Sequence, residues 1–240
     1  MQKLIIKWQD PLNFAQKIAQ NYNDENWAFL YSALSSEVDK SKSYIALFVK
    51  NQIIGNSFSE AQKIINTSQD KYFGYISYEV ADEFEDLKFS QNQCLDLPKI
   101  HLSSFSLILE FDHKNKELCA FFDNQSQLDE VLNLKEKSDK YFDINIKNIS
   151  SNFTNKSYLE AISKIRNMIS IGDFYQTNLT RKFFGNFSEK PSSNKAFSLF
   201  KDLCQQSPAN YASFLKLDDN FKPLDGISLV PLISGKPFDE

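Results

Sequence analysis

The chain has 240 residues, of which 42% are hydrophobic and 24% charged, enough for one large or two small globular domains. A mean hydropathy of −0.42, with no apolar run near the roughly 20 residues that span a bilayer, excludes a transmembrane helix. With 27 basic and 31 acidic residues the net charge is −4, and no basic tract is present, so small molecules or proteins are better candidate partners than nucleic acid.

Cysteine usage and the start of the sequence indicate a reducing compartment. Cys94, Cys119 and Cys204 are odd in number and far apart, which favours neither a disulfide framework nor a zinc site. The apolar stretch Leu4–Ile6 is too short for a signal peptide, and no small-residue cleavage site follows it. We therefore expect a cytoplasmic protein.

Strand and helix patterns alternate through the first half of the chain. A strand is expected over residues 4–8, then a helix that Asp10 caps, that has Pro11 at its first position and that ends near Tyr22. Further strands are expected at 27–33, 43–49, 72–78, 101–111 and 117–122, and a helix at 57–66. The last two strands flank the turn Asp112–Lys116 and form a hairpin.

The second half begins with a polar stretch, residues 123–155, which predicts a linker. Beyond it, Ser157–Glu160 can form a capping box, and Gly172 would end the helix in a left-handed conformation. The apolar residues at helical spacing between them are Tyr158, Ile162, Ile165 and Ile169. Short strands mixed with helices, without a regular βαβ rhythm, favour an α+β fold.

The most informative segment is Gly172–Arg181, which reads Gly-Asp-Phe-Tyr-Gln-Thr-Asn-Leu-Thr-Arg. On a strand, Gln176, Asn178 and Thr180 would point to one face, where their amide and hydroxyl groups could hold a polar ligand. A solvated face of an edge strand explains the same periodicity equally well.

The predicted helix and this motif together resemble the opening of the chorismate-binding domain shared by anthranilate synthase and aminodeoxychorismate synthase component I. The matching motif residues are Gly172, Asp173, Tyr175 and Gln176. The form Tyr-Gln-x-Asn-Leu-Thr is similar to the para-aminobenzoate branch, whereas anthranilate synthases more often have an apolar residue where Asn178 stands. The resemblance implies an α+β fold of the anthranilate synthase component I type, with antiparallel sheets flanked by helices and incomplete at the C-terminus.

Three weaker matches occur in the order that the family requires, and they extend the resemblance from about Asp24 to about Leu217. Residues 27–32 resemble an early strand whose serine, here Ser32, helps to line an amino-acid pocket that binds tryptophan in relatives. Residues 73–79 resemble the Gly-Tyr-x-Ser-Tyr strand, without the doubled glycine usual before it.

The third match, residues 207–214, resembles Asn-Pro-Ala-Pro-Tyr. Ser207 and Asn210 replace the family's Asn and second Pro, which changes the expected shape of the pocket. Together these matches imply a tryptophan-type amino-acid pocket. Its candidate residues are Ser32, Asn178, Pro208 and Tyr211.

The family's catalytic half has no counterpart in the sequence. It comprises a Ser-Pro-Glu-Arg strand, a Pro-Ile-x-Gly-Thr element, acidic residues that hold magnesium on chorismate, and a histidine and an arginine that bind its carboxylates. Residues 220–240 do not resemble the family, and we interpret this as a premature stop or frameshift near Phe221. We expect no catalytic residue, metal ligand or cofactor in this chain, and Mg²⁺ only in the complete family enzyme.

The resemblance predicts four parts: an anthranilate synthase component I N-terminal-like region (1–122), a polar linker (123–155), the start of the chorismate-binding domain (156–219) and a divergent tail (220–240). It implies amination of chorismate to aminodeoxychorismate, towards para-aminobenzoate and folate, with ammonia from a glutamine amidotransferase subunit (component II). The chain alone is expected to be inactive and to need a C-terminal half encoded separately.

Alternatives remain open for the function and for several residues. The chain could be a non-catalytic remnant, an amino-acid-binding fragment or, more weakly, part of an anthranilate synthase. The acidic residues within 79–86 are expected to form a solvated face, and His101 and His113 to be structural. The phenylalanines expected to pack a core are Phe183, Phe184, Phe187, Phe197 and Phe200.

Overall fold

The computed structural model describes residues 1–32, 42–86, 97–137, 146–188 and 192–217. The chain forms two compact units, a first unit of Met1–Phe142 with Pro191–Lys222 and a second unit of Asp143–Lys190 with Pro223–Glu240. This division differs from the expected one, because residues 192–217 pack with the N-terminal region. No helix in the described residues is long and apolar enough to cross a membrane.

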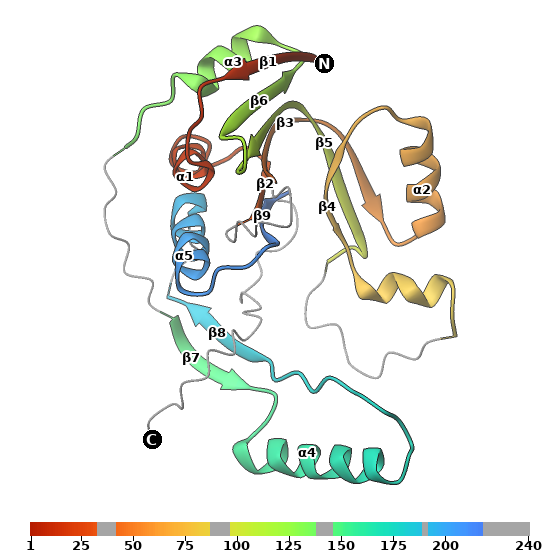
Figure 1. The fold of residues 1–240 in the computed structure, drawn as a ribbon. Helices are drawn as coiled ribbons and strands as arrows, with labels where there is room; N and C mark the ends of the chain where they lie inside the picture. Colours follow the sequence, from red (N-terminus) through yellow and green to blue (C-terminus); the bar gives the residue numbers. More distant parts are fainter. Residues whose placement is uncertain (33–41, 87–96, 138–145, 189–191, 218–240) are drawn as a thin grey trace. The chain divides into compact units, whose positions relative to one another are not determined.

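The first unit is built on a sheet with seven described strands, all paired antiparallel (Figure 1). The strands are β1 (Gln2–Ile6), β2 (Trp27–Tyr31), β3 (Lys42–Gly55), β4 (Tyr72–Ile76), β5 (Ile100–Asp112), β6 (Glu117–Phe122) and β9 (Ala212–Lys216). Their order is β1-β6-β5-β3-β2-β9, with β4 paired to β5. The expected α+β class with antiparallel sheets is therefore confirmed.

Five described helical segments accompany this sheet. They are α1 (Pro11–Asn21), α2 (Phe58–Thr67), the 3-10 helix η1 (Tyr78–Glu83), α3 (Gln125–Leu132) and α5 (Ser193–Gln206). The first begins as predicted: Asp10 accepts a hydrogen bond from the backbone N–H of Asn13 at 2.9 Å, and Pro11 occupies the first turn. Tyr22 is its C-cap residue.

The main core lies between the sheet and the pair α1 and α5, which lie side by side (Figure 1). Trp27 and Phe29 of β2 and Phe197 of α5 are fully buried there. Phe200 packs against this cluster, so the core prediction holds for it and for Phe197. Phe184 is 39% exposed, contrary to expectation. Its strand, Phe183–Phe187, pairs with one other described strand, and this pairing does not cover the side chain of Phe184.

The β5–β6 hairpin forms as predicted, and its turn is held by Asp112. The carboxylate of Asp112 accepts the backbone N–H groups of Lys114 and Asn115, both at 2.9 Å. These hydrogen bonds lower the pKa of Asp112 below its usual range. The turn therefore has a fixed geometry, which places His113 at the sheet end.

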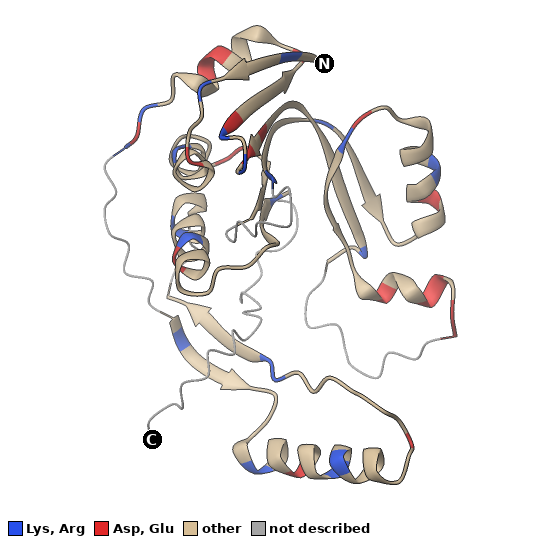
Figure 2. Cartoon of the chain, viewed as in Figure 1, with Lys and Arg blue, Asp and Glu red and all other residues tan. Residues whose placement is uncertain are grey.

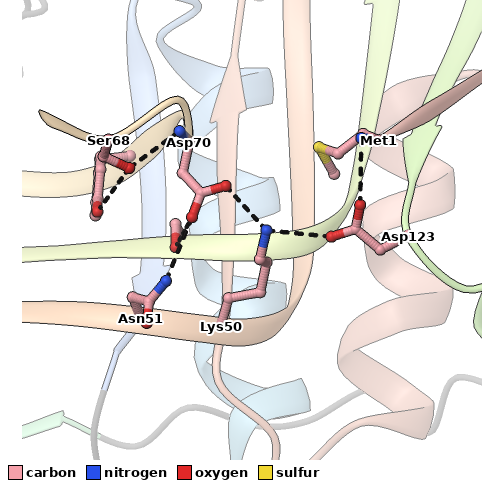
Figure 3. Close-up of polar contacts among 8 residues, drawn as sticks. Met1, Lys50, Asn51, Ser68, Asp70 and Asp123 are labelled. Carbon is pink, nitrogen blue, oxygen red and sulfur yellow. Dashed lines mark hydrogen bonds and ion pairs between the residues drawn. The ribbon is translucent and has the colours of Figure 1, made fainter.

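A bulge in β3 brings together a small charged network, drawn in Figure 3. The register with β5 shifts between Val49 and Asn51, so Lys50 leaves the regular pairing. Its ammonium group lies 2.9 Å from Asp70 and 3.2 Å from Asp123. The network thereby ties β3 to the turn before β4 and to the end of β6.

The acidic residues of η1 have structural partners, and Figure 2 shows their charges beside those of α2. The Glu83 carboxylate accepts the backbone N–H groups of Phe58 and Ser59 at the start of α2. Asp82 pairs with Lys99. Because the N–H groups of a first helical turn lack partners within the helix, Glu83 acts as a second cap for α2.

The second unit contains β7 (Ile146–Ser151), α4 (Asn155–Ser170) and β8 (Phe183–Phe187), with β7 and β8 paired antiparallel. Helix α4 begins earlier than predicted, because Thr154 and Ser157 form the capping box and Ser157 is its third helical residue. Gly172 ends the helix with φ +85°, as predicted. Strand β7 and, in the first unit, α3 lie within the segment 123–155 expected to be a linker.

The motif itself does not form the expected strand. Residues 173–182 have neither helical nor strand structure, and β8 begins only at Phe183. Among the described residues, β8 pairs with β7, and no strand pairs with 173–182. The alternating face expected from Gln176, Asn178 and Thr180 is therefore wrong, because a strand needs a neighbour to take its backbone hydrogen bonds.

Candidate functional site

The candidate site lies where β2 ends and the neighbouring strand β9 begins. These strands are antiparallel neighbours, and their last pair joins Tyr31 to Ala212. Ser32 follows Tyr31 and Tyr211 precedes Ala212, so the two candidate residues continue the same register. The structure thus brings together Ser32 and Tyr211, which lie 179 positions apart in the chain.

The two residues differ in exposure. Ser32 is buried at 6% exposure, whereas the Tyr211 side chain is 91% exposed. Pro208 is also exposed and lies in the segment between α5 and β9. A buried polar residue and an exposed aromatic residue thus follow each other in register at this end of the sheet.

Asn178 belongs to the second unit, and its side chain is exposed there. The motif residues Asp173, Tyr175 and Gln176 are exposed as well, and Tyr175 is completely so. The role of Asn178 in an amino-acid pocket stays a prediction.

Two residues beside Ser32 were not among the candidates. The Ser43 Oγ of β3 lies 3.0 Å from the backbone nitrogen of Ser32 and 2.7 Å from Nε2 of His113. Ser43 is completely buried. The sequence signal for this contact was weak, since His113 sits in a turn and the pairing of Ser43 with Phe111 follows only from the register of β3 and β5.

The surroundings of His113 favour its neutral form. Its ring packs edge-on against Trp8, with 5.7 Å between centroids, and lies 6.3 Å from the ring of Tyr31. Burial is the main cause that lowers the pKa of His113, and the Lys116 ammonium adds to it. Asp10 and Asp112 act in the opposite direction without reversing the shift.

Metal ligation finds no support in the part of the chain that the structure describes. No group of three or more His, Cys, Asp or Glu side chains there could hold a metal ion. Cys119 and Cys204 are buried free thiols, and Cys94 lies outside the described residues.

Helix α4 presents an uncovered apolar surface. None of its residues is buried. Leu159 is 63% exposed and Ile169 40% exposed, and Ile171 just after the helix is 65% exposed. A helix with apolar residues at these positions normally packs them against another element. No described element covers them.

Comparison with known proteins places this architecture in a family. The sequence model of the family described as chorismate binding enzyme matches residues 14–226. The chain belongs to the chorismate binding enzyme family. The matched region is wider than the span from Asp24 to Leu217 over which the motifs were found.

Individual relatives include both branches considered above. The chain is 25% identical over 174 residues to anthranilate synthase component 1 of Bacillus subtilis strain 168, covering 61% of this chain and 33% of that protein. It is 22% identical over 160 residues to aminodeoxychorismate synthase component 1 of the same strain, again with 61% and 33% coverage. The chain therefore spans about a third of the length of these curated relatives.

Solved structures agree on the fold. Anthranilate synthase component I from Streptococcus pneumoniae TIGR4 superposes with a TM-score of 0.55 at 17% identity, over 74% of this chain and 48% of that one. The menaquinone-specific isochorismate synthase from Escherichia coli gives 0.56 at 10% identity, over 91% and 48%. At these identities the likeness shows the anthranilate synthase component I type of fold.

Proposed function

We propose that this chain is the N-terminal part of an aminodeoxychorismate synthase component I. In this proposal it serves the amination of chorismate to aminodeoxychorismate, for para-aminobenzoate and folate, in the cytoplasm. The observation that carries the choice of branch is the Tyr-Gln-x-Asn-Leu-Thr form of the motif, with Asn178 and Thr180, inside a chain of the chorismate binding enzyme family. Anthranilate synthesis is the weaker alternative.

The proposal requires the rest of the family fold, on a continuation of this chain or on a separate polypeptide. Two observations support such a partner: the chain covers about a third of its curated relatives, and α4 exposes Leu159 and Ile169. The partner would cover this apolar face and supply the Mg²⁺ ligands. In that setting Mg²⁺ would shield the charge of the diacid substrate and assist loss of its hydroxyl group. A glutamine amidotransferase subunit would supply ammonia.

The test is an ammonia-dependent chorismate consumption assay with Mg²⁺. The chain is purified alone and together with a polypeptide that carries the Pro-Ile-x-Gly-Thr element and the later acidic motifs, encoded downstream. Consumption only in the mixture, with aminodeoxychorismate as product, is the expected result. Anthranilate as product would move the chain to the other branch, and an inactive mixture of folded proteins would contradict the proposal.

Variants of α4 sharpen the assay. Leu159→Asp places a charge on the apolar face and is expected to prevent complementation by the second polypeptide, since an unpaired charge in an apolar interface is costly. Lys164→Asp changes the charge at an exposed polar position of the same helix and is the matched control. Equal activity of the two variants would mean that the partner does not cover this face.

A second candidate function is binding of an amino acid of the tryptophan type at Ser32 and Tyr211. It is favoured by the juxtaposition of these two residues at the ends of β2 and β9. Calorimetric titration of the folded chain with tryptophan tests it, and Tyr211→Ala is expected to weaken binding. Absence of heat with a folded sample would exclude the binding role.

A further inference from the structure

A chain of hydrogen bonds joins the β5–β6 turn to the end of β2. Ser43 Oγ contacts both the backbone nitrogen of Ser32 and Nε2 of His113. Because Ser43 is completely buried, its hydroxyl must find its partners inside the protein. A serine hydroxyl has one proton to donate and two lone pairs, so it can accept the Ser32 N–H and donate to a ring nitrogen that carries no proton.

The protonation state of the ring decides whether this arrangement is possible. A neutral imidazole with its proton on Nδ1 offers Nε2 as an acceptor to Ser43. A protonated ring donates from both nitrogens, so Ser43 could only accept from it and would lose the acceptor for its own proton. The arrangement in which Ser43 donates to His113 and accepts from Ser32 therefore belongs to the neutral ring. With a protonated ring Ser43 can still accept from Ser32, but its own buried proton loses this acceptor, which weakens the arrangement.

We propose that His113 is a positioning residue for the amino-acid site, whose neutral ring holds Ser43 and through it the backbone of Ser32, and whose protonation weakens ligand binding. This inference rests on the second candidate function above. The residues that face the ring are consistent with a neutral state at pH 7. Its charged and titratable neighbours are Asp10 before α1, Tyr31 on β2, and Asp112 and Lys116 in the turn.

The sign of the effect follows from linkage. Burial and Lys116 already lower the pKa of His113 below the ordinary value of about 6.5. If a proton weakens the binding of a ligand, the ligand must weaken the binding of the proton by the same factor. Occupation of the site is therefore expected to lower the pKa of His113 further.

Nuclear magnetic resonance of the full chain provides a test without a ligand. The chain has two histidines, so the ring signals of His113 and His101 can be assigned by a single substitution. Between pH 8 and pH 4.5 the backbone amide of Ser32 is expected to shift with the same midpoint as the ring of His113. A ring that stays neutral down to pH 4.5, or a Ser32 amide that does not follow it, would overturn the inference.

Binding measurements then use tryptophan as the probe. For the wild-type chain, Kd is expected to rise about fivefold between pH 7.5 and pH 5, the factor that loss of one hydrogen bond would produce. His113→Gln keeps a neutral side chain with an acceptor oxygen, so its Kd at pH 7.5 should stay near that of the wild type and lose its pH dependence. Ser43→Ala should weaken binding at both pH values.

The matched control is His101→Gln, which alters the other buried histidine, on β5. It should leave the pH dependence of tryptophan binding unchanged. Persistence of the pH dependence in His113→Gln would overturn the inference. A Ser32 amide that follows the ring of His113 in a folded chain that binds no tryptophan would support the hydrogen-bond relay and contradict the amino-acid site.

Discussion

The substitution Phe197→Ala tests whether the C-terminal described segment is part of the first unit's core. Phe197 is completely buried, and its ring lies within 6.0 Å, centroid to centroid, of the rings of Trp27, Phe29, Phe200 and Phe214. Removing a buried phenylalanine costs about 3 to 5 kcal/mol, and loss of several aromatic contacts places this case towards the upper end. A domain of ordinary stability has only about 5 to 15 kcal/mol in total.

The assay is urea unfolding followed by tryptophan fluorescence. Both tryptophans, Trp8 and Trp27, lie in the first unit, and Trp27 packs directly on Phe197. Tyr211→Ala is the matched control, because it removes an aromatic ring from the same segment that is 91% exposed, and it should cost less than about 0.5 kcal/mol. Equal midpoints for the two variants would refute the packing of α5 against the N-terminal core.

Three further substitutions probe the first unit. Gly74→Ala should destabilise it by about 2 kcal/mol or more, because the added methyl group would collide with the backbone of β5, whereas Gly55→Ala meets nothing within 4 Å and should be tolerated, as paired urea midpoints will show. Asp10→Ala should cost about 1 kcal/mol through loss of the α1 cap, visible in the same assay. Lys50 lowers the pKa of Asp70, so this ion pair stabilises the fold fully above a pH of about 4. This stabilisation is lost as the pH falls through the lowered pKa of Asp70. Asp70→Asn should therefore lower the unfolding free energy at pH 7 and reduce its dependence on acidic pH.

Local signals in the sequence predicted those elements whose ends are set by local chemistry. Asp10 and Pro11 define the start of α1, and the Asp112 turn defines the β5–β6 hairpin, because in both cases a side chain a few residues away satisfies the backbone. Helix α3 was not predicted, although Asn124 caps it. Its sequence is mostly polar, and Leu128 and Val131 are its only buried residues.

Elements that depend on distant partners were predicted less well. Strand β3 continues past Val49 to Gly55 through the polar residues Lys50 and Gln52, because β5 pairs with it on both sides of the bulge at Lys50. The motif Gly172–Arg181 was expected to form a strand from its alternation, yet no described strand pairs with residues 173–182. Alternation in the sequence shows which side chains would lie on the same face of a strand. The strand itself forms only when a neighbouring strand takes its backbone hydrogen bonds.

The candidate site also depends on residues that are distant in the sequence, so its geometry depends on the packing of the core. Ser32 belongs to the N-terminal region, and Tyr211 comes from a segment that returns to the first unit only after β7, α4 and β8. Their juxtaposition depends on the pairing of β2 with β9, and β9 is supported by the contact of Phe214 with Phe197. If the candidate site binds tryptophan as proposed, a variant that loosens α5 should lose that binding before the rest of the sheet unfolds, because the site needs the returning segment while β1, β3, β5 and β6 pair without it.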